Sequence, residues 1–436
     1  MAELIEPRLL KGFRDFLPRD ERERQRIEQT LGRTFAAFGF EPIDTPILEY
    51  TEILLGKGGG ETDKQIYRFD DQGGRDVAMR YDLTVPFARF MALHLHDLPL
   101  PFKRFHIAKV FRGENTQRGR YREFVQCDFD IVGSDSASAD FEIVLLMDRS
   151  FRAIGVDEVR IHLSHRGVFN SLLAGLGVAD RGEQVLRAVD KLRKIGEAEV
   201  RAQLEEITGT AVTDTIMAYV TRGPDNESTL ESMRKLAPDA ERDLGRLGEV
   251  LQAARTVGIS DRIVLDPSIT RGLDYYTGIV FETFLTALPE IGSVCSGGRY
   301  DNLASLYTKE RLPGVGTSIG LDRLMAGLEE LSVADTQTGG ADAIVLCSDG
   351  TLMGRYHAIA DELRTAGLRI DVFPECRKLG PQYTFAEKKG VPVAVIVEGA
   401  GDTVTVRELQ SRTNTGGLTV GDAAAVIQSL TAGRAL

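Results

Sequence analysis

The sequence lacks the features that direct proteins to membranes or out of the cell. Nowhere in its 436 residues do about 18 apolar residues follow one another, which excludes an obvious membrane-spanning helix. The N-terminus lacks the basic stretch followed by an apolar run that marks a secretion signal. We therefore expect a cytoplasmic protein with no membrane partner, long enough for two to four domains of roughly 100 to 200 residues each.

Cysteine and histidine are too sparse to indicate a cross-linked or metal-stabilised fold. The four cysteines form no C-x-x-C pair, so we expect neither a disulfide framework nor a zinc site, and each is expected to be a small core or near-site residue. Among the six histidines, His94 and His96, and His162 and His165, are close in sequence but have no convincing further ligands. No protein-bound metal is expected. The four cysteines are Cys127, Cys295, Cys347 and Cys376.

An overall excess of positive charge is also absent. The formal net charge of -12 argues against a nucleic-acid partner, because binding phosphates requires a positive face. Between Lys103 and Glu123, however, seven basic residues stand against two acidic ones. This local basic patch reopens the possibility of a nucleotide or RNA ligand, although a patch of surface salt bridges is the alternative interpretation.

The first three quarters of the chain predict an α+β domain. Apolar residues at helical spacing between Glu21 and Phe38 predict a helix that ends at Gly39. Strand-like pieces flank a turn at 70–74, and the segment 104–132 has the pattern of a second hairpin. Hairpins favour a mainly antiparallel sheet. We predict such a domain over 1–331, with a helical insertion at about 178–257.

The last quarter predicts a separate domain. Residues 332–341 are small and polar, as in a linker. Beyond them, apolar runs alternate with helical stretches, which predicts an α/β domain over 342–436.

The segment Arg120–Val132 carries the most informative pattern. As a strand of period two, it would place its apolar residues on one face, and Arg122, Phe124, Gln126, Asp128 and Asp130 on the other. The second face combines a guanidinium, an aromatic ring, an amide and carboxylates. Such a set could stack a base, hold a phosphate and bind an ammonium or imidazole, although a solvated outer face is the plainer alternative.

Five segments resemble one enzyme family. Three of them are similar to the defining motifs of class II aminoacyl-tRNA synthetases, and two resemble signatures peculiar to histidyl-tRNA synthetases. Lys11–Asp15 and the C-terminal domain, which resembles the anticodon-binding domain of this subgroup (IIa), extend the resemblance over essentially the whole chain. The class motifs are Gly39–Pro46, Val110–Phe124 and Gly316–Leu324, and the histidine signatures are Ile269–Gly278 and Ser296–Leu303.

The resemblance implies a nucleotide site. Arg112 would hold the α-phosphate of ATP, Glu114 would contact the adenine, Phe124 would stack on it, and Arg323 would bind the γ-phosphate. Arg271 is implied to be a second catalytic arginine beside Arg112, placed at the α-phosphate and the histidine carboxylate. Mg²⁺ is expected on the outer phosphates.

The resemblance also implies a histidine site. Asp82, Thr84 and Gln126 would bind the α-amino group, while Asp130 and Tyr276 would face the two imidazole nitrogens. Arg112, Arg271 and Tyr275 complete the expected histidine-binding set. The segment Arg80–Thr84 contains Asp-Leu-Thr, which resembles the eukaryotic-type branch, where the common bacterial form has Glu-Gly-Thr.

The expected activity is ligation of L-histidine to tRNA(His) with ATP by a homodimer. Two other functions are compatible with the class motifs. One is a non-catalytic, histidine-sensing paralogue that regulates a phosphoribosyltransferase; such paralogues usually lack the C-terminal domain and degrade the histidine signatures, whereas this chain keeps both. The other is a class II synthetase for a different amino acid.

Overall fold

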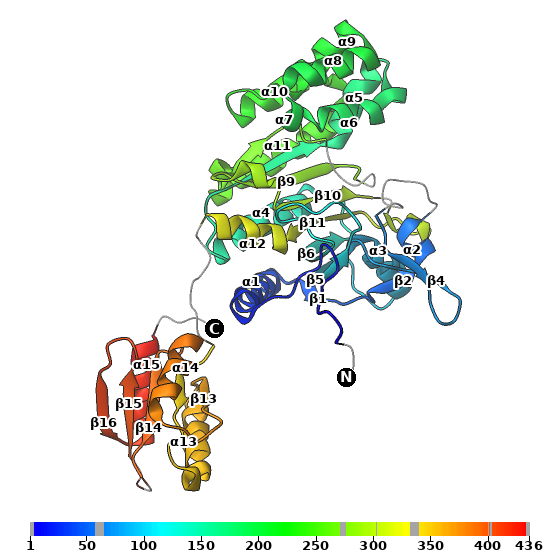
Figure 1. Ribbon diagram of the computed structural model, residues 1–436. Coiled ribbons are helices and arrows are strands. Elements are labelled where there is room, and N and C mark those ends of the chain that lie inside the picture. The colour runs from blue at the N-terminus through cyan, green and yellow to red at the C-terminus, as the bar shows by residue number, and fades with distance from the viewer. Residues whose placement is uncertain are drawn as a thin grey trace. The chain divides into compact units, whose positions relative to one another are not determined.

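A computed structural model describes residues 4–56, 65–270, 276–301, 303–331, 340–399, 401 and 403–432. The chain divides into two compact units, one formed by Met1–Asp15 with Arg24–Ala334 and the other by Phe16–Glu23 with Asp335–Leu436 (Figure 1). Each unit is described by itself. No helix among the described residues is long and apolar enough to cross a membrane. The expected linker lies almost entirely outside the described residues.

A mixed sheet of eight strands forms the centre of the first unit. Only the two edge pairs, β1 with β5 and β7 with β8, are parallel, and every other neighbouring pair is antiparallel. This confirms the predicted α+β class on a mainly antiparallel sheet. In spatial order, the strands are β1 (Glu41–Pro42), β5 (Phe102–Phe111), β6 (Glu123–Val132), β11 (Gly314–Gly320), β10 (Cys295–Tyr300), β9 (Ile279–Leu285), β7 (Val159–His165) and β8 (Ile263–Leu265).

Helices cover the apolar side of this sheet. The predicted N-terminal helix is α1 (Pro18–Ala37), and its residues Ile27, Leu31 and Phe35 are fully buried at the spacing of one helix face. They pack in the same core as Val125 and Phe129 of β6. The other helices of this layer are α4 (Ala137–Ala153) and α12 (Leu321–Glu330), and α3 (Thr84–His94) and the short α2 (Thr51–Leu55) accompany a smaller sheet.

That smaller sheet contains the predicted first hairpin. Strands β3 (Arg68–Asp70) and β4 (Asp76–Met79) are antiparallel, and β2 (Leu48–Tyr50) pairs with the other side of β4. The Asp71 carboxylate accepts hydrogen bonds from the backbone N–H of Gly73 at 2.8 Å and of Arg75 at 2.9 Å. These bonds close the turn that the sequence predicts.

The segment that follows β7 is helical until β8. Its buried residues join the core of the first unit, so the segment is packed rather than solvated on both sides. The helices are α5 (Arg166–Gly175), α6 (Gly182–Val189), α7 (Leu192–Ile195), α8 (Glu197–Thr208), α9 (Thr210–Val220), α10 (Asn226–Leu236) and α11 (Glu241–Val257).

The second unit is an α/β domain. Strand β12 (Ala343–Val345) lies parallel to β13 (Ile370–Val372) and to β14 (Val393–Val397), as predicted from the alternating pattern. The antiparallel strands β15 (Val404–Glu408) and β16 (Asn414–Leu418) extend the sheet. The helices are α13 (Met353–Thr365), α14 (Leu379–Lys389) and α15 (Val420–Thr431).

One expectation about the cysteines is wrong. Cys347 and Cys376 form a disulfide, with their Cα atoms 4.9 Å apart, whereas Cys127 and Cys295 are free and buried as expected. The two partners follow the carboxyl ends of β12 and β13, which are parallel neighbours. Their separation of 29 residues gives no sign of this contact, because parallel pairing alone brings the two strand ends together.

Candidate active site

A cavity of about 320 Å³ opens on the polar face of the eight-stranded sheet. Its walls come from segments that are far apart in the sequence, namely the start of α3, the loop between β5 and β6, strands β6, β9, β10 and β11 with the residues beside them, and the first turn of α12. The lining residues are Asp82, Thr84, Arg112, Glu114, Arg120, Gln126, Asp128, Asp130, Tyr276, Phe281, Glu282, Ser293, Ser296, Gly297, Tyr300, Gly316, Thr317, Ser318 and Arg323.

Strand β6 forms one wall of the cavity because its side chains alternate between the cavity and the core. Gln126, Asp128 and Asp130 line the cavity, while Cys127 and Phe129 between them are fully buried in the core on the other side. The predicted division of this strand into a core face and a site face is therefore confirmed.

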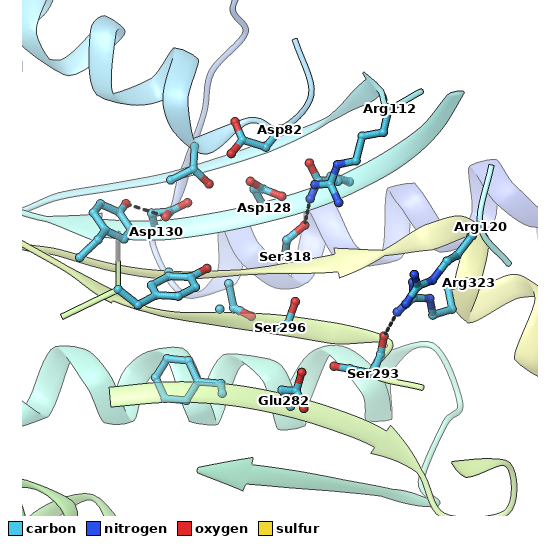
Figure 2. A pocket seen from close by; sticks show the side chains of 18 of the residues that line it. Asp82, Arg112, Arg120, Asp128, Asp130, Glu282, Ser293, Ser296, Ser318 and Arg323 are labelled. Atoms are coloured by element: carbon cyan, nitrogen blue, oxygen red, sulfur yellow. Dashed lines mark hydrogen bonds between the residues drawn. The ribbon is translucent and has the colours of Figure 1, made fainter. Parts of the chain in front are cut away.

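The cavity has two ends of opposite charge. Figure 2 shows the carboxylates of Asp82, Asp128 and Asp130 at one end and the guanidinium groups of Arg120 and Arg323 at the other. A ligand that carries a positive group at one end and several negative groups at the other would match this arrangement.

Asp82 stands at the start of α3. Its Oδ1 accepts a hydrogen bond from the backbone N–H of Val85 at 3.1 Å, so the first turn of the helix fixes the carboxylate. Burial raises the pKa of Asp82 to about 6, although this hydrogen bond and the nearby Arg112 favour the ionised form. Burial therefore disfavours the charged form of this carboxylate.

A buried arginine organises the two carboxylates of β6. Arg104 of β5 has no exposed surface, and its guanidinium lies 2.7 Å from Asp130 Oδ2, 3.8 Å from Asp128 and over the ring of Phe87. The hydroxyl of Tyr300 donates a hydrogen bond to Asp130 Oδ1 at 2.7 Å. Asp130 therefore has a hydrogen bond on one oxygen and an ion pair on the other.

Asp128 lies farther from Arg104 than Asp130 does. Burial raises its pKa to about 7, opposed by Arg104 and reinforced by the neighbouring Asp130 and Asp82 carboxylates. Burial likewise raises the pKa of Asp130, which Arg104 and the Tyr300 hydroxyl oppose. One guanidinium thus faces two buried carboxylates, and it pairs closely with only one of them.

The opposite end continues into a second cavity of about 100 Å³. Arg112, Glu114, Gln126 and Arg323 line both cavities, and Phe124 lines only the second. The Arg112 Nε donates to the carbonyl of Tyr81 at 2.9 Å, and its guanidinium lies 5.1 Å from the ring centre of Phe124. Arg323 Nη1 donates to the carbonyl of Ser293 at 2.7 Å.

The N-terminal segment braces the hairpin formed by β5 and β6. The backbone N–H of Arg122 donates to the carbonyl of Gly12 at 2.9 Å, and the guanidinium of Arg14 lies 3.3 Å from the ring centre of Tyr121. Arg14 also pairs with Asp322 of α12, whose other oxygen accepts from the N–H of Val125 at 2.7 Å. Lys11–Asp15 is therefore part of the wall that positions Arg112 and Phe124.

Comparisons with known proteins agree with this geometry. The family model described as "Histidyl-tRNA synthetase" matches residues 12–324, and that described as "Anticodon binding domain" matches residues 342–430. The chain belongs to the histidyl-tRNA synthetase family.

Individual relatives extend over nearly the whole chain. Proteins named histidine–tRNA ligase are similar to it in Treponema denticola, 51% identical over 90% of this chain and 89% of the relative, and in Rhodopirellula baltica, 48% identical over 91% of each. The crystal structure of histidyl-tRNA synthetase from Nostoc sp. PCC 7120 has a TM-score of 0.88, with 32% identity over 98% of this chain and 100% of that one.

Most residues that the family resemblance singled out come together in this structure. Asp82, Thr84, Gln126, Asp130 and Tyr276 line the first cavity. The four expected ATP residues, Arg112, Glu114, Phe124 and Arg323, line the second. Arg271 and Tyr275 lie outside the described residues, and Tyr276, which directly follows Tyr275, is at the cavity wall.

The structure adds residues to which the sequence gave no role. Sequence patterns placed Asp128 on the polar face of a strand and Arg120 in the basic patch. Strand alternation predicts which face a side chain is on, but it does not predict what that side chain contacts. Tyr300 belongs to the second histidine signature, and only the fold places its hydroxyl on Asp130. Arg104 looked like one member of a basic patch, and its burial against two carboxylates depends on the pairing of β5 with β6.

Proposed function

We propose that the chain is a histidine–tRNA ligase. It activates L-histidine with ATP to form histidyl-adenylate and pyrophosphate, and then transfers the histidyl group to the terminal adenosine of tRNA(His). The observation that carries the proposal is the cavity with opposite charges at its two ends. Histidine brings a cationic ammonium, and ATP brings polyanionic phosphates, so the two substrates match the two ends.

At the arginine end, the proposed ligand is ATP. Arg112 would contact the α-phosphate, Arg323 the γ-phosphate, Glu114 the adenine, and Phe124 would stack on the base. Attack by the histidine carboxylate on the α-phosphorus brings two anions together and builds negative charge on the phosphoryl oxygens. Fixed guanidinium groups at this end offset that charge without having to reorganise during the reaction.

Mg²⁺ would accompany ATP as part of the substrate. Among the described residues, no group of three or more histidine, cysteine, aspartate or glutamate side chains is arranged to hold a metal ion. Mg²⁺ keeps much of its water and commonly binds through substrate phosphates. The proposed site therefore needs no dedicated set of protein ligands for it.

At the acidic end, the proposed ligand is histidine. Asp82, Thr84 and Gln126 would bind its α-amino group, and Asp130 and Tyr276 would face the imidazole nitrogens. Asp130 already receives the Tyr300 hydroxyl, but a carboxylate has about four acceptor positions and can take a further N–H. An analogue without that N–H would leave a buried acceptor unpaired, which is a strong basis for rejection.

Arg271 and Tyr275 complete the proposal. Arg271 would act at the α-phosphate and the histidine carboxylate, and Tyr275 would contribute to the histidine pocket. Both roles rest on the family motif, and the position of Tyr276 at the cavity supports them.

Three further features are proposed for the whole protein. The chain would act in the cytoplasm, and residues 342–436 would bind the tRNA anticodon, with basic side chains at 377–378 and 388–389 as candidates for the contact. It would form a homodimer through the first unit. Large apolar side chains that are 42% to 51% exposed on and beside the three-stranded sheet support this, namely Ile47, Leu48, Tyr50 and Phe69.

Exchange of labelled pyrophosphate into ATP tests the activity. We expect exchange that requires histidine and that no other amino acid supports. Folded protein that binds histidine without exchange would instead indicate a histidine-sensing regulator, and exchange driven by another amino acid would indicate a different synthetase. Light scattering coupled to size exclusion tests the homodimer.

A further inference from the structure

Four buried acceptor oxygens on residues that line the cavity have no hydrogen-bond partner among the described residues. One is Asp130 Oδ2, which lies 2.7 Å from the Arg104 guanidinium in an ion pair. The other three are Asp82 Oδ2, Gln126 Oε1 and Asp128 Oδ1. All three residues line the first cavity. Buried polar atoms without partners are rare in folded proteins, so a group of three in one cavity points to a ligand that donates to them.

The rest of each side chain is already held. Asp82 uses Oδ1 to accept from Val85 N–H at 3.1 Å, and Gln126 uses Nε2 to donate to Ser318 Oγ at 3.0 Å. Asp128 lies two residues from Gln126 on the same strand face, opposite Ser318 in the register of β6 with β11. Asp82 and Gln126 thus each have one polar atom held by the protein and one oxygen without a partner in the part of the chain that the structure describes. Figure 2 shows Asp82 and Asp128 on the wall of the same cavity.

Asp128 differs in this respect from Asp130. Asp130 has Tyr300 on one oxygen and Arg104 at 2.7 Å on the other, whereas Arg104 is 3.8 Å from Asp128. That distance is beyond a hydrogen bond. Asp130 is therefore the closer counter-ion of Arg104. Pairing with Arg104 does not explain why Asp128 is buried with an unpaired oxygen.

The chemistry of the orphaned atoms specifies the missing partner. When the two carboxylates are ionised, their oxygens and the amide oxygen cannot satisfy one another, because all three then only accept hydrogen bonds. Asp82 and Asp128 line the same cavity, and the Asp82 charge adds to the effects of burial and of Asp130 that raise the pKa of Asp128. A primary ammonium has three N–H donors, no acceptor and one positive charge, and it satisfies all three oxygens at once.

We infer that Asp128 is a specificity-determining residue that binds the α-ammonium of the amino-acid substrate, as a third acceptor beside Asp82 and Gln126. The inference rests on the proposed function, which brings an α-amino acid to this end of the cavity. Its consequence is selection for a free amino group, because a ligand with the imidazole but no amine leaves the unpaired oxygens of two buried carboxylates without a hydrogen-bond donor.

The test compares two ligands in the full-length chain. Calorimetry without ATP gives the Kd of histidine and of 3-(imidazol-4-yl)propanoate, which lacks only the α-amine. In Asp128→Asn we expect histidine to bind about 10- to 100-fold more weakly, the range for a hydrogen bond to a charged group. We expect the affinity of the amine-free ligand to be unchanged or improved.

Asp130→Asn is the matched control, because it removes a carboxylate on the same face of the same strand. It should weaken both ligands alike, since its proposed partner is the imidazole. Asp128→Asn should fold, because burial disfavours the charge that it removes, and Asp128→Ser gives the same prediction with a smaller side chain. Circular dichroism checks the fold of each variant.

The outcomes separate the inference from the proposed function. Equal weakening of both ligands in Asp128→Asn and Asp128→Ser, or no weakening of histidine, overturns the inference. Failure of the unmodified protein to bind histidine overturns the proposed function itself.

Discussion

Histidine binding should release protons near neutral pH, because the cavity holds two carboxylates that are partly protonated before the ligand arrives. Burial raises the pKa of Asp128 to about 7 and that of Asp82 to about 6. At pH 7, Asp128 then carries about half a proton and Asp82 about a tenth of one. An ammonium bound between them favours the ionised form of both, so these protons leave.

The ligand adds its own contribution. A free imidazole with an ordinary pKa of about 6.5 is about a quarter protonated at pH 7, and it loses that proton if it binds as the neutral ring. The expected total is most of one proton per histidine at pH 7. At pH 8 both carboxylates are already ionised in the free protein, and the total falls to about 0.1.

Burial is the largest cause of the raised pKa of Asp128, and the charged and polar groups around it modify that shift. Arg104 of β5 lowers the pKa of Asp128, while Asp130 on the same strand and Asp82 before α3 raise it, and Ser318 of β11 lowers it by hydrogen bonding. Because Arg104 lies closer to Asp130 than to Asp128, a bound ammonium would add positive charge beside Asp128.

Isothermal titration calorimetry measures the number directly. The apparent binding enthalpy is plotted against the ionisation enthalpy of several buffers, and the slope gives the protons released. In Asp128→Asn the release at pH 7 should fall by about half, because Asp128 no longer contributes a proton. A slope near zero for the unmodified protein, or an unchanged slope in the variant, would refute the reasoning.

Three further perturbations have distinct expected results. A methyl group at Gly316 would lie 1.9 Å from Asp130 Oδ1, so Gly316→Ala should displace that carboxylate and weaken histidine binding at least about 100-fold in calorimetry. Arg271→Ala should keep the histidine Kd but slow pyrophosphate exchange by about 100- to 1000-fold, because its contribution grows in the transition state. Reducing the bond between Cys347 and Cys376, which are 29 residues apart, should lower the free energy of unfolding of the second unit by about 3 to 4 kcal/mol, measured by denaturant titration with and without a thiol reductant.

Each of these has a control. Gly245→Ala places a methyl group in open space on α11 and should leave histidine binding unchanged. Histidine binding by Gly316→Ala that is as tight as binding by Gly245→Ala would contradict the steric argument. Equal loss of binding and rate in Arg271→Ala would remove its proposed catalytic role. For the cysteines, identical unfolding curves in both conditions, with mass spectrometry confirming the oxidised bond, would show that closing this loop contributes nothing.

Local pattern was sufficient to predict the elements that carry the site. The alternation in β6 depends only on the geometry of a strand, so the face that holds Gln126, Asp128 and Asp130 could be assigned from sequence. The helical spacing of Ile27, Leu31 and Phe35 and the turn at Asp71 are local in the same sense.

What sequence could not supply were properties that depend on pairing between distant strands. Asp128 and Asp130 are the same residue type on the same face, and pattern alone treats them alike. They differ because Arg104 and Tyr300, from β5 and β10, reach one carboxylate more closely than the other. The disulfide was missed for the same reason, since the neighbouring positions of β12 and β13 bring its two cysteines together.

Residues of the third class motif, Gly316–Leu324, pack directly against the acidic end of the cavity. Gly316 lies opposite Asp130 in the register of β11 with β6, and a Cβ there would meet the Asp130 carboxylate and, at 2.8 Å, the carbonyl of Phe129. Ser318, two residues on, holds the amide of Gln126. The small residues of β11 thus leave room for one side chain of β6 and orient another. In sequence they read as part of a nucleotide motif, and in the fold they also shape the proposed amino-acid pocket. A change that enlarges either residue should therefore affect histidine recognition before it affects ATP binding.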